Sequence, residues 1–479
     1  MVESEQPGLA RHVTRTRLVM VVVALLVSLT PLVAFPTRPM MTASNQDLAD
    51  RILPAATLVV EQDEAPQVAA EPQREPQRPP PPPLDDSPFF VSPDRGDNAN
   101  AGNTIDAPWA SLQFALDQLR PGDTLYLMEG TYDELRVDNF HYVMRNSGQP
   151  DAWIRVTAAP GHEPVLIPTE GTAFEVQANY VEVSNLTVRG EGFNETNSYG
   201  VGLSVRRSHH VRLLANVVSG MPLAGISCIE SSNLEIIDNE IFENAFWSTA
   251  QGSGISIWHS LDWGQPPAAD GYHDRILGNK IYRNENRVKS KWVNFTTITD
   301  GNGIIIDQNR DFNYTGRTLI ANNVVFDNGG RAILVFESNR VDVIFNTTYH
   351  NGRTVGLDGG PVELAAGTAT DVRFFNNLAW ALPSAPAMRA SGSREVTSGG
   401  NVLITTNPLG AGEQDLVLSV GPGVISPSTD ERTADFRPEA TGVLIDRAMA
   451  FEPALPYDID GTDRPEGSAD VGAYEIDVG

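Results

Sequence analysis

The sequence GLSVRRSHHVRLLAN (202–216) decides the fold, because its pattern returns four more times before residue 347. Each copy starts with a short apolar stretch and ends, after polar residues or an insertion, with a second apolar stretch that closes on asparagine. The later copies start at GISC (225–228), GISI (254–257), GIII (303–306) and AILV (332–335) and end at Asn239, Asn279, Asn323 and Asn346. A repeat of about 23 residues with two or three short strands per copy predicts a stacked parallel β-solenoid.

The spacing of the asparagines shows where the repeat is uneven. We expect a ladder of structural asparagines, because asparagine suits turns and stacked side-chain amides bond from coil to coil. The predicted ladder positions are Asn185, Asn216, Asn239, Asn279, Asn323, Asn346, Asn377 and Asn401. The spacings on either side of Asn279 are 40 and 44 residues, so two adjacent coils carry long insertions. Insertions at one corner of neighbouring coils would form the wall of a groove.

Composition and charge limit the partners and the compartment. The chain has 479 residues and a formal net charge of −27, which excludes nucleic acid as a partner, since phosphate binding needs a basic face. Its single cysteine, Cys228, permits no internal disulfide, and it aligns with apolar positions of the repeat, so we expect it in the core. A solenoid grows in one dimension, and we expect a monomer.

The chain divides into four parts. Residues 1–41 form a signal peptide or a membrane anchor, whose apolar segment is 18–35, and both readings place the rest outside the cytoplasm, extracellular or at the cell surface. Residues 42–87 are a proline-rich, disordered linker. The solenoid is expected over 88–440 and a closing segment over 441–479.

A helix is predicted near the start of the solenoid. Pro108 can open it, since its missing N–H costs nothing in the first turn. Trp109, Leu112, Leu116 and Leu119 then form one apolar stripe at helical spacing. Because the end of a solenoid exposes apolar side chains and strand edges, we expect this helix to cap it.

Two segments carry a family resemblance. FFVSP (89–93) with PGDTLYL (121–127), and YDIDGTDRPEGSADVGAYE (457–475), resemble the opening and closing parts of secreted right-handed parallel β-helix proteins. That superfamily includes pectate-lyase-like, chondroitinase-B-like and alginate-lyase-like enzymes and mannuronan C5-epimerases. The resemblance spans about residues 89–476 and implies an all-β, right-handed parallel β-helix. The motifs specific to the epimerases, to many pectate lyases and to polygalacturonases are absent, so no catalytic residue is carried over.

The insertions hold most of the residues suited to sugar binding. They are 261–274 and 285–302, with a further bulge at 308–317, and four of the seven tryptophans and all three lysines lie in or beside them. Tryptophan offers a rigid apolar face to a pyranose ring, and Arg or Lys pairs with a uronate carboxylate. We therefore expect an acidic polysaccharide as partner; the alternative is that the tryptophans only pack the loops. The substrate-binding candidates are Arg206, Trp247, Trp258, Trp263 and Trp292.

Alternation along the repeated strands indicates which side chains face outward. The first and third residues after the repeat glycine are always apolar and should point into the coil. The fourth residue should point out, which places Arg206, Trp258 and Asp307 in one outward row on strands about 4.8 Å apart. Such a row beneath loop walls predicts a ligand floor.

Three activities remain open: uronate β-elimination, which we favour, polysaccharide C5-epimerisation, and non-catalytic carbohydrate binding or a surface-structural role. Elimination needs a neutralised carboxylate, a base for the C5 proton and an acid for the leaving oxygen. The catalytic candidates are His259, His273, Lys289, Lys291 and Arg317. Calcium is the predicted cofactor, and its candidate oxygen ligands are Asp300, Asp307 and Asp311.

Overall fold

The computed structural model describes residues 88–134 and 140–476. The predictions for the N-terminal anchor or signal and for the proline-rich linker lie outside these residues. Within the described ranges, no helix combines the length and the apolar character that a membrane crossing requires.

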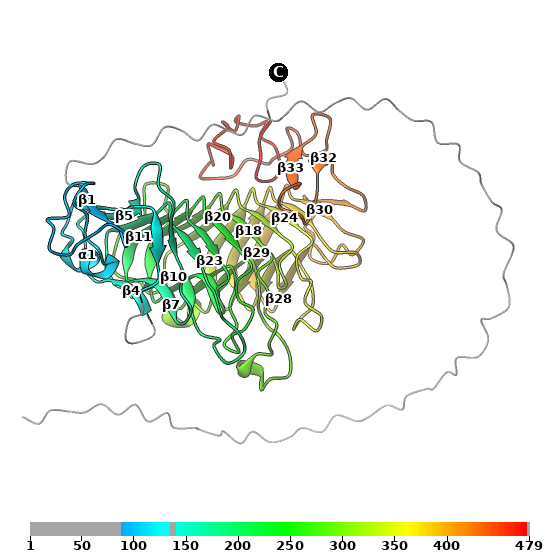
Figure 1. The fold of residues 1–479 in the computed structure, drawn as a ribbon. Coiled ribbons are helices and arrows are strands. Elements are labelled where there is room, and N and C mark those ends of the chain that lie inside the picture. The colour runs from blue at the N-terminus through cyan, green and yellow to red at the C-terminus, as the bar shows by residue number, and fades with distance from the viewer. Residues whose placement is uncertain (1–87, 135–139, 477–479) are drawn as a thin grey trace, which may run out of the picture. The chain divides into compact units, whose positions relative to one another are not determined.

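The described chain winds through three parallel sheets in turn, so the predicted all-β parallel β-helix is confirmed (Figure 1). The sheets are named A, B and C here, and each coil enters sheet C, then A, then B. Sheet C has nine strands: β4 (Phe140–Met144), β7 (Thr172–Val176), β10 (Val201–Arg206), β13 (Ala224–Ile229), β16 (Ile255–Trp258), β19 (Ile304–Asp307), β22 (Ile333–Phe336), β25 (Leu364–Gly367) and β28 (Met388–Ser391).

Sheets A and B complete each coil with eleven strands apiece. Sheet A contains β1 (Pro88–Val91), β2 (Thr124–Leu127), β5 (Ile154–Ala158), β8 (Val181–Ser184), β11 (His209–Leu214), β14 (Ser232–Ile237), β17 (Asp274–Leu277), β20 (Thr318–Ala321), β23 (Asn339–Ile344), β26 (Thr370–Phe375) and β29 (Arg394–Gly399). Sheet B contains β3 (Gly130–Tyr132), β6 (Pro164–Leu166), β9 (Thr187–Arg189), β12 (Val217–Ser219), β15 (Glu240–Phe242), β18 (Lys280–Tyr282), β21 (Val324–Phe326), β24 (Thr347–Tyr349), β27 (Leu378–Trp380), β30 (Val402–Ile404) and β31 (Leu416–Leu418). An antiparallel pair, β32 (Val424–Ser426) and β33 (Asp435–Pro438), follows the last coil.

The repeat register holds from coil to coil. Leu203 pairs with Ile226, and Ile304 pairs with Ile333, and these side chains are at most 1% exposed. Cys228 lies in the same core, as predicted, and burial raises the pKa of its thiol. Each buried Val, Leu or Ile side chain contributes about 1.5–3 kcal/mol to folding, so the inward rows supply most of the drive for coiling.

Two asparagine ladders hold the turns of successive coils together. In the predicted ladder, the amide of Asn279 donates to the Oδ1 atom of Asn323 at 2.9 Å, and the same contact repeats from Asn216 to Asn401. A second ladder, which was not predicted, runs through Asn244, Asn284, Asn328 and Asn351. Both ladders end on a carboxylate, Asp415 for the first and Glu363 for the second.

One predicted ladder residue is wrong. The ladder position in its coil is Leu186, whose N–H donates to the Oδ1 atom of Asn216 at 3.1 Å. Asn185 lies one residue earlier, in the left-handed turn position with φ 56°, and its amide donates to Thr157. Asparagine is common both in left-handed turn positions and in the ladder position, so the spacing alone could not tell residue 185 from residue 186.

The N-terminal helix begins later than predicted. Helix α1 spans Leu112–Gln118, and Ser111 is its N-cap, accepting the N–H of Phe114. Pro108 does not open it, and Trp109 instead stacks on Phe89 with ring centroids 4.9 Å apart. The predicted buried leucines are confirmed, and the helix side chain of Gln113 bonds the backbone of β4.

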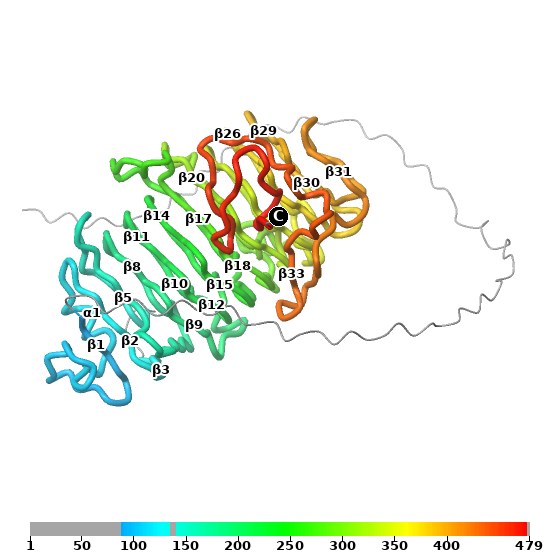
Figure 2. Tube along the Cα trace, turned by 90° about the horizontal axis from the view of Figure 1, so that it is seen from above, coloured from blue at the N-terminus to red at the C-terminus, as the bar shows by residue number. Residues whose placement is uncertain are grey.

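The C-terminal segment lies along the stack, over strands of sheets A and B (Figure 2). Arg464, 9% exposed, fixes it: its guanidinium donates to Asn322 of the solenoid and pairs with Glu475 at 3.2 Å. The segment predicted to close the solenoid therefore covers its side.

The ladder predicts a large cost for removing one central asparagine. Asn279→Ala removes both ladder bonds of this side chain and leaves the buried backbone N–H of Asn239 without its acceptor. A buried group without a partner costs about 1–3 kcal/mol, so the thermal midpoint should fall by several degrees. Asn185→Gly is the control, because glycine accepts the left-handed φ at that turn. Equal midpoints for Asn279→Ala and the parent protein, in scanning calorimetry, would contradict the ladder's role.

Candidate functional site

The outer face of sheet C forms the floor of the candidate site. Trp258 pairs in register with Asp307, and Asp307 with Phe336, so these side chains stand side by side on β16, β19 and β22. Arg206 and Ile229 continue the same row toward the N-terminus. The predicted outward row of Arg206, Trp258 and Asp307 is confirmed.

The insertions form walls on both edges of this floor. Segments 259–273 and 308–317 leave sheet C toward sheet A and form the A-side wall, joined by a 2.7 Å hydrogen bond from Thr315 to Asp262. Segments 245–253, 285–302 and 350–362 lead from sheet B into sheet C and form the B-side wall. The prediction that both long insertions share one corner is wrong, because they lie at opposite edges of sheet C.

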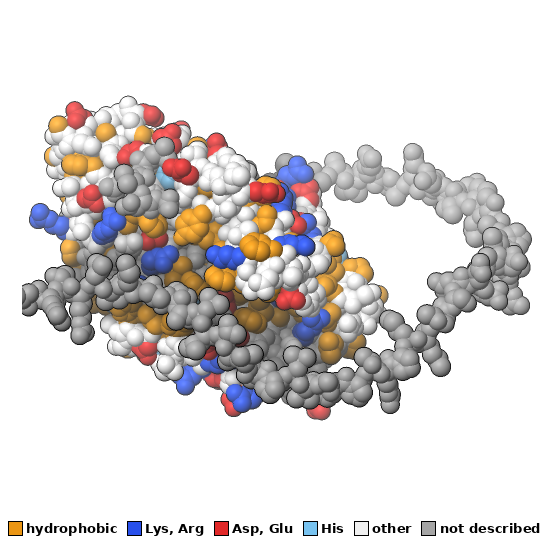
Figure 3. Space-filling model, turned by 90° about the horizontal axis from the view of Figure 1, so that it is seen from below, with side chains coloured by type: hydrophobic (Ala, Val, Ile, Leu, Met, Phe, Trp, Pro, Cys, Tyr) orange, Lys and Arg blue, Asp and Glu red, His pale blue; other side chains and the backbone are white. Residues whose placement is uncertain are grey.

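The view from below, onto the side where β7, β10 and β28 are labelled in Figure 1, shows this face of the molecule (Figure 3). Apolar and basic side chains share the middle of the face there. This mixture is what an anionic ligand with apolar C–H faces would require.

Asp307 has an unusual environment on the floor. Its Oδ1 atom is buried and has no hydrogen-bond partner, although the residue as a whole is half-buried. Burial, with the nearby carboxylates of Asp300 and Glu337, raises the pKa of Asp307 to about 8. The carboxyl group is therefore neutral at pH 7 and can donate a proton.

The three predicted metal ligands do not assemble one calcium site. Asp300 accepts hydrogen bonds from Asn302 and Thr299, and burial raises its pKa against the effect of Arg331. Asp311 is exposed and pairs with Arg310 at 3.1 Å. Among the residues that the structure describes, no group of three or more His, Cys, Asp or Glu side chains is arranged to hold a metal ion. We therefore derive no step from calcium.

His259 is positioned on the A-side edge of the floor. Its ring stacks between Trp258 and Phe312, with centroid separations of 3.8 and 4.0 Å. Its Nε2 atom lies 3.0 Å from the Oε1 atom of Gln308, which also accepts from Trp258 at 3.1 Å. The other end of Gln308 donates to Glu337, so its Oε1 is the acceptor and the proton of neutral His259 sits on Nε2. The Nδ1 lone pair of His259 is then available as a base.

Arg206 supplies the cation of the floor. Its Nε atom is 3.6 Å from the carboxylate of Glu175, and its side chain is 34% exposed while that of Glu175 is 1% exposed. Glu175 also accepts hydrogen bonds from Gln177 and Ser204. The guanidinium is thus fixed from beneath and still open to an incoming carboxylate.

Two catalytic candidates lie on the sheet A side and not on the floor. Arg317 pairs with Asp342 at 2.7 Å and with Asp371, and so serves as an anchor of sheet A. His273 precedes β17, packs edge-on to Tyr314, and has a buried Nδ1 atom without a hydrogen-bond partner. Each is the last residue of its segment, directly before a strand of sheet A, so it belongs to an insertion in sequence but lies beside sheet A.

The remaining candidates belong to the walls. Lys289 and Lys291 are exposed on the B-side wall, where the Lys291 ammonium lies 4.4 Å from the ring centroid of Trp292. Trp247 lies half-buried at the base of that wall. Trp263 belongs to the A-side wall, 39% exposed, with its indole N–H donating to the Glu230 carbonyl at 3.1 Å. His259 therefore lies at the A-side edge of the floor, and Lys289 and Lys291 lie at its B-side edge.

Gln308, Glu337 and Phe312 were not among the predicted site residues. Gln308 and Glu337 occupy the same place as His259, the residue after the outward row, and all three have positive φ. This turn position forms a second outward row beside the first. The repeat predicts this row too, because its members directly follow Trp258, Asp307 and Phe336 in the sequence.

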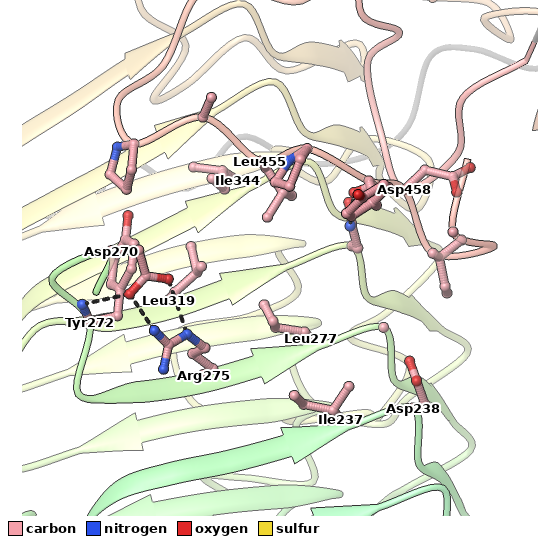
Figure 4. Close-up of a pocket in the computed structure, with 18 of the residues that line it drawn as sticks. Ile237, Asp238, Asp270, Tyr272, Arg275, Leu277, Leu319, Ile344, Leu455 and Asp458 are labelled. Carbon is pink, nitrogen blue, oxygen red and sulfur yellow. Dashed lines mark hydrogen bonds and ion pairs between the residues drawn. The ribbon is translucent and has the colours of Figure 1, made fainter. Parts of the chain in front are cut away.

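A separate cavity lies on sheet A, away from the floor (Figure 4). Its volume is about 760 Å³, and it is bounded by the outer face of sheet A and by residues 453–461 of the C-terminal segment. The ion pair of Arg275 with Asp270 lines one part of it, and Asp238 lines another (Figure 4).

The chain is similar to a family model, to a curated protein and to solved structures. A family model described as "Pel9A-like, right handed beta helix region" matches residues 89–262. Pectate lyase PEL9 of Emericella nidulans is 47% identical over 249 residues, which cover 45% of this chain and 57% of that protein. The chain thus matches little more than half of the curated relative's length. A structure of pectate lyase Pel9A has 19% identity and a TM-score of 0.47, with 81% of this chain and 96% of that one covered. XylC with xylose has 10% identity and the same TM-score, with coverages of 81% and 98%.

Because the Oδ1 atom of Asp307 is buried without a hydrogen-bond partner, replacing this residue should stabilise the protein at high pH. Its pKa is raised from 3.8 to about 8 in the folded state, so its contribution to stability is full below pH 3.8 and is lost as pH rises through about 8. Asp307→Asn removes a group that must ionise while buried, so the variant should melt above the parent protein at pH 9. The gain should shrink toward pH 5.

Calorimetry at both pH values checks this expectation, with the exposed Asp106→Asn as the matched control. A lower midpoint for Asp307→Asn at pH 9 would show that Asp307 has stabilising partners when it is charged.

Proposed function

We propose that this parallel β-helix protein, whose residues 89–262 match a Pel9A-like family model, cleaves an acidic polysaccharide by β-elimination over sheet C. The observation that carries the proposal is Asp307, a neutral, partner-free carboxyl group on an aromatic and cationic floor. Burying an unpaired carboxyl group lowers the stability of the fold, so this group is not explained by a structural role.

The groove supplies binding before chemistry. A glycan that runs across the strands of sheet C would stack a pyranose face on Trp258 and bring a carboxylate to Arg206. Pairing with Arg or Lys withdraws charge from the uronate carboxylate. This makes the C5 proton more acidic, which elimination requires.

Two proton carriers lie on adjacent strands. His259 follows β16 and Asp307 ends β19, and these strands are direct neighbours. The Nδ1 atom of His259 takes the C5 proton, and the electrons of that C–H bond form the C4–C5 double bond. The C4–O4 bond breaks, and the carboxyl group of Asp307 gives its proton to the leaving O4 oxygen. Solvent then returns a proton to Asp307 and removes one from His259.

The hydrogen bonds around His259 set the direction of this transfer. The chain from Glu337 through Gln308 keeps the proton of His259 on Nε2, and the rings of Trp258 and Phe312 hold the imidazole plane. Glu337 and Gln308 are therefore positioning residues. We place the activity outside the cytoplasm, where the polymer is found and where residues 18–35 would direct the chain.

The test is an assay of unsaturated product on polygalacturonate, alginate, chondroitin sulfate and glucuronan. Elimination produces an unsaturated uronate that absorbs in the ultraviolet. Asp307→Asn and His259→Ala should each lower kcat by about 100-fold or more, and Asp106→Asn should not. With Asp307 as the acid, kcat/KM should fall as pH rises through about 8, because the donating form is lost.

Three outcomes separate the alternatives. New reducing ends without ultraviolet absorbance would show hydrolysis and overturn the proposal. Exchange of the C5 proton with deuterated solvent, without chain cleavage, would assign the same groove to an epimerase. Binding to one of these polymers without any reaction would make the protein a carbohydrate-binding module.

A further inference from the structure

The B-side wall ends in a projection that the proposed reaction does not use. We call it the wall tip, residues 289–298 with 355–357. A hydrogen bond from Thr297 to the Gly356 carbonyl joins its two segments, and the backbone N–H of Asp358, the residue after the second segment, donates to the Ile298 carbonyl at 2.8 Å. The tip is thus a braced structure and not an isolated loop.

Apolar side chains are exposed on the wall tip. Trp292 is 66% exposed, Phe295 is 57% exposed and Val355 is 97% exposed. Single exposed apolar residues are ordinary, but a cluster of them on one projection marks an interaction surface. Trp292 is also held in place, because its indole N–H donates to the Ala250 carbonyl at 2.8 Å. Its ring face is therefore presented with little conformational freedom left to lose on binding.

The charge of the wall tip is opposite to that of the chain. Its longer segment, residues 289–298, holds Lys289 and Lys291 and no acidic residue, on a protein whose net charge is −27. The Lys291 ammonium lies over the face of Trp292 at 4.4 Å from the ring centroid. A ligand that stacks on this ring and carries a negative charge would meet both groups at once.

We propose that the wall tip is a second binding site, separate from the floor of sheet C, for a further stretch of the same anionic polysaccharide. This rests on the proposed function only for the identity of the polymer. A lipid surface fits less well, because one indole and one phenyl ring on a short braced tip offer little area to insert into a bilayer, whereas a pyranose face matches one indole. Continuity with the B-side wall lets one polymer reach both sites.

Retention in gels that contain polygalacturonate tests the proposal. All proteins carry Asp307→Asn, so that the polymer stays intact, and Trp292→Ala is compared with that background. The dissociation constant should rise roughly tenfold, which corresponds to about 1.4 kcal/mol, and Trp292→Phe should recover part of the loss. Lys289→Gln with Lys291→Gln should weaken binding at low salt and less at high salt, where exposed charges are screened. Tyr457→Ala, an exposed aromatic residue on the sheet A side, is the control and should not change retention.

Two results would overturn this inference: no retention of the background protein, or unchanged retention of Trp292→Ala with an unchanged melting temperature. Sedimentation with phosphatidylserine–phosphatidylcholine vesicles tests the lipid alternative. If Trp292→Ala loses vesicle binding but keeps polymer binding, the wall tip binds lipid and the proposal is rejected. If no unsaturated product forms but Trp292→Ala is retained less than the background protein, the proposed chemistry is rejected and the second binding site is supported.

Discussion

The hydrogen bond from the side chain of one buried asparagine to the next, such as Asn279 to Asn323 at 2.9 Å, fixes the pitch of this protein. Two such ladders run through the turns of the central coils, on either side of sheet B. Because each amide is buried, a slip of the register would leave donors and acceptors without partners, at about 1–3 kcal/mol each. The outward rows of sheet C are therefore in register, and Trp258, Asp307 and Phe336 lie next to one another although 29 to 49 residues separate neighbours in sequence.

The rigid stack of coils holds the carboxyl group of Asp307 in an environment that disfavours its charged form. Asp307 has a buried oxygen without a partner and two carboxylates nearby, an arrangement that raises its pKa and disfavours its charged form. A flexible chain would move the side chain into water. Here β16 and β22 bracket β19 on both edges, and the core side chains Ile304 and Ile306 fix it from within. The fold thus holds a carboxylic acid that is neutral at pH 7, which is the state that proton donation requires.

The sequence allows some parts of this arrangement to be predicted and not others. The period-two alternation in GISIW and GIIID predicts the inward isoleucines and the outward Trp258 and Asp307, since a parallel sheet leaves no other register for them. The spacing of Asn239, Asn279 and Asn323 counts residues per coil, but it does not say which corner receives an insertion. For that reason Arg317 and His273 were expected in the groove although they lie on the sheet A side. The isolation of Asp307 depends on which side chains fail to reach it, and that becomes visible only in three dimensions.

A crystal structure of Asp307→Asn with an acidic oligosaccharide would test the central claim most directly. The account predicts a glycan across sheet C, with a ring stacked on Trp258, a carboxylate at Arg206 and a glycosidic oxygen within hydrogen-bonding reach of the side chain at position 307. An oligosaccharide bound in the sheet A cavity beside Arg275, or one whose glycosidic oxygens all lie away from position 307, would contradict it.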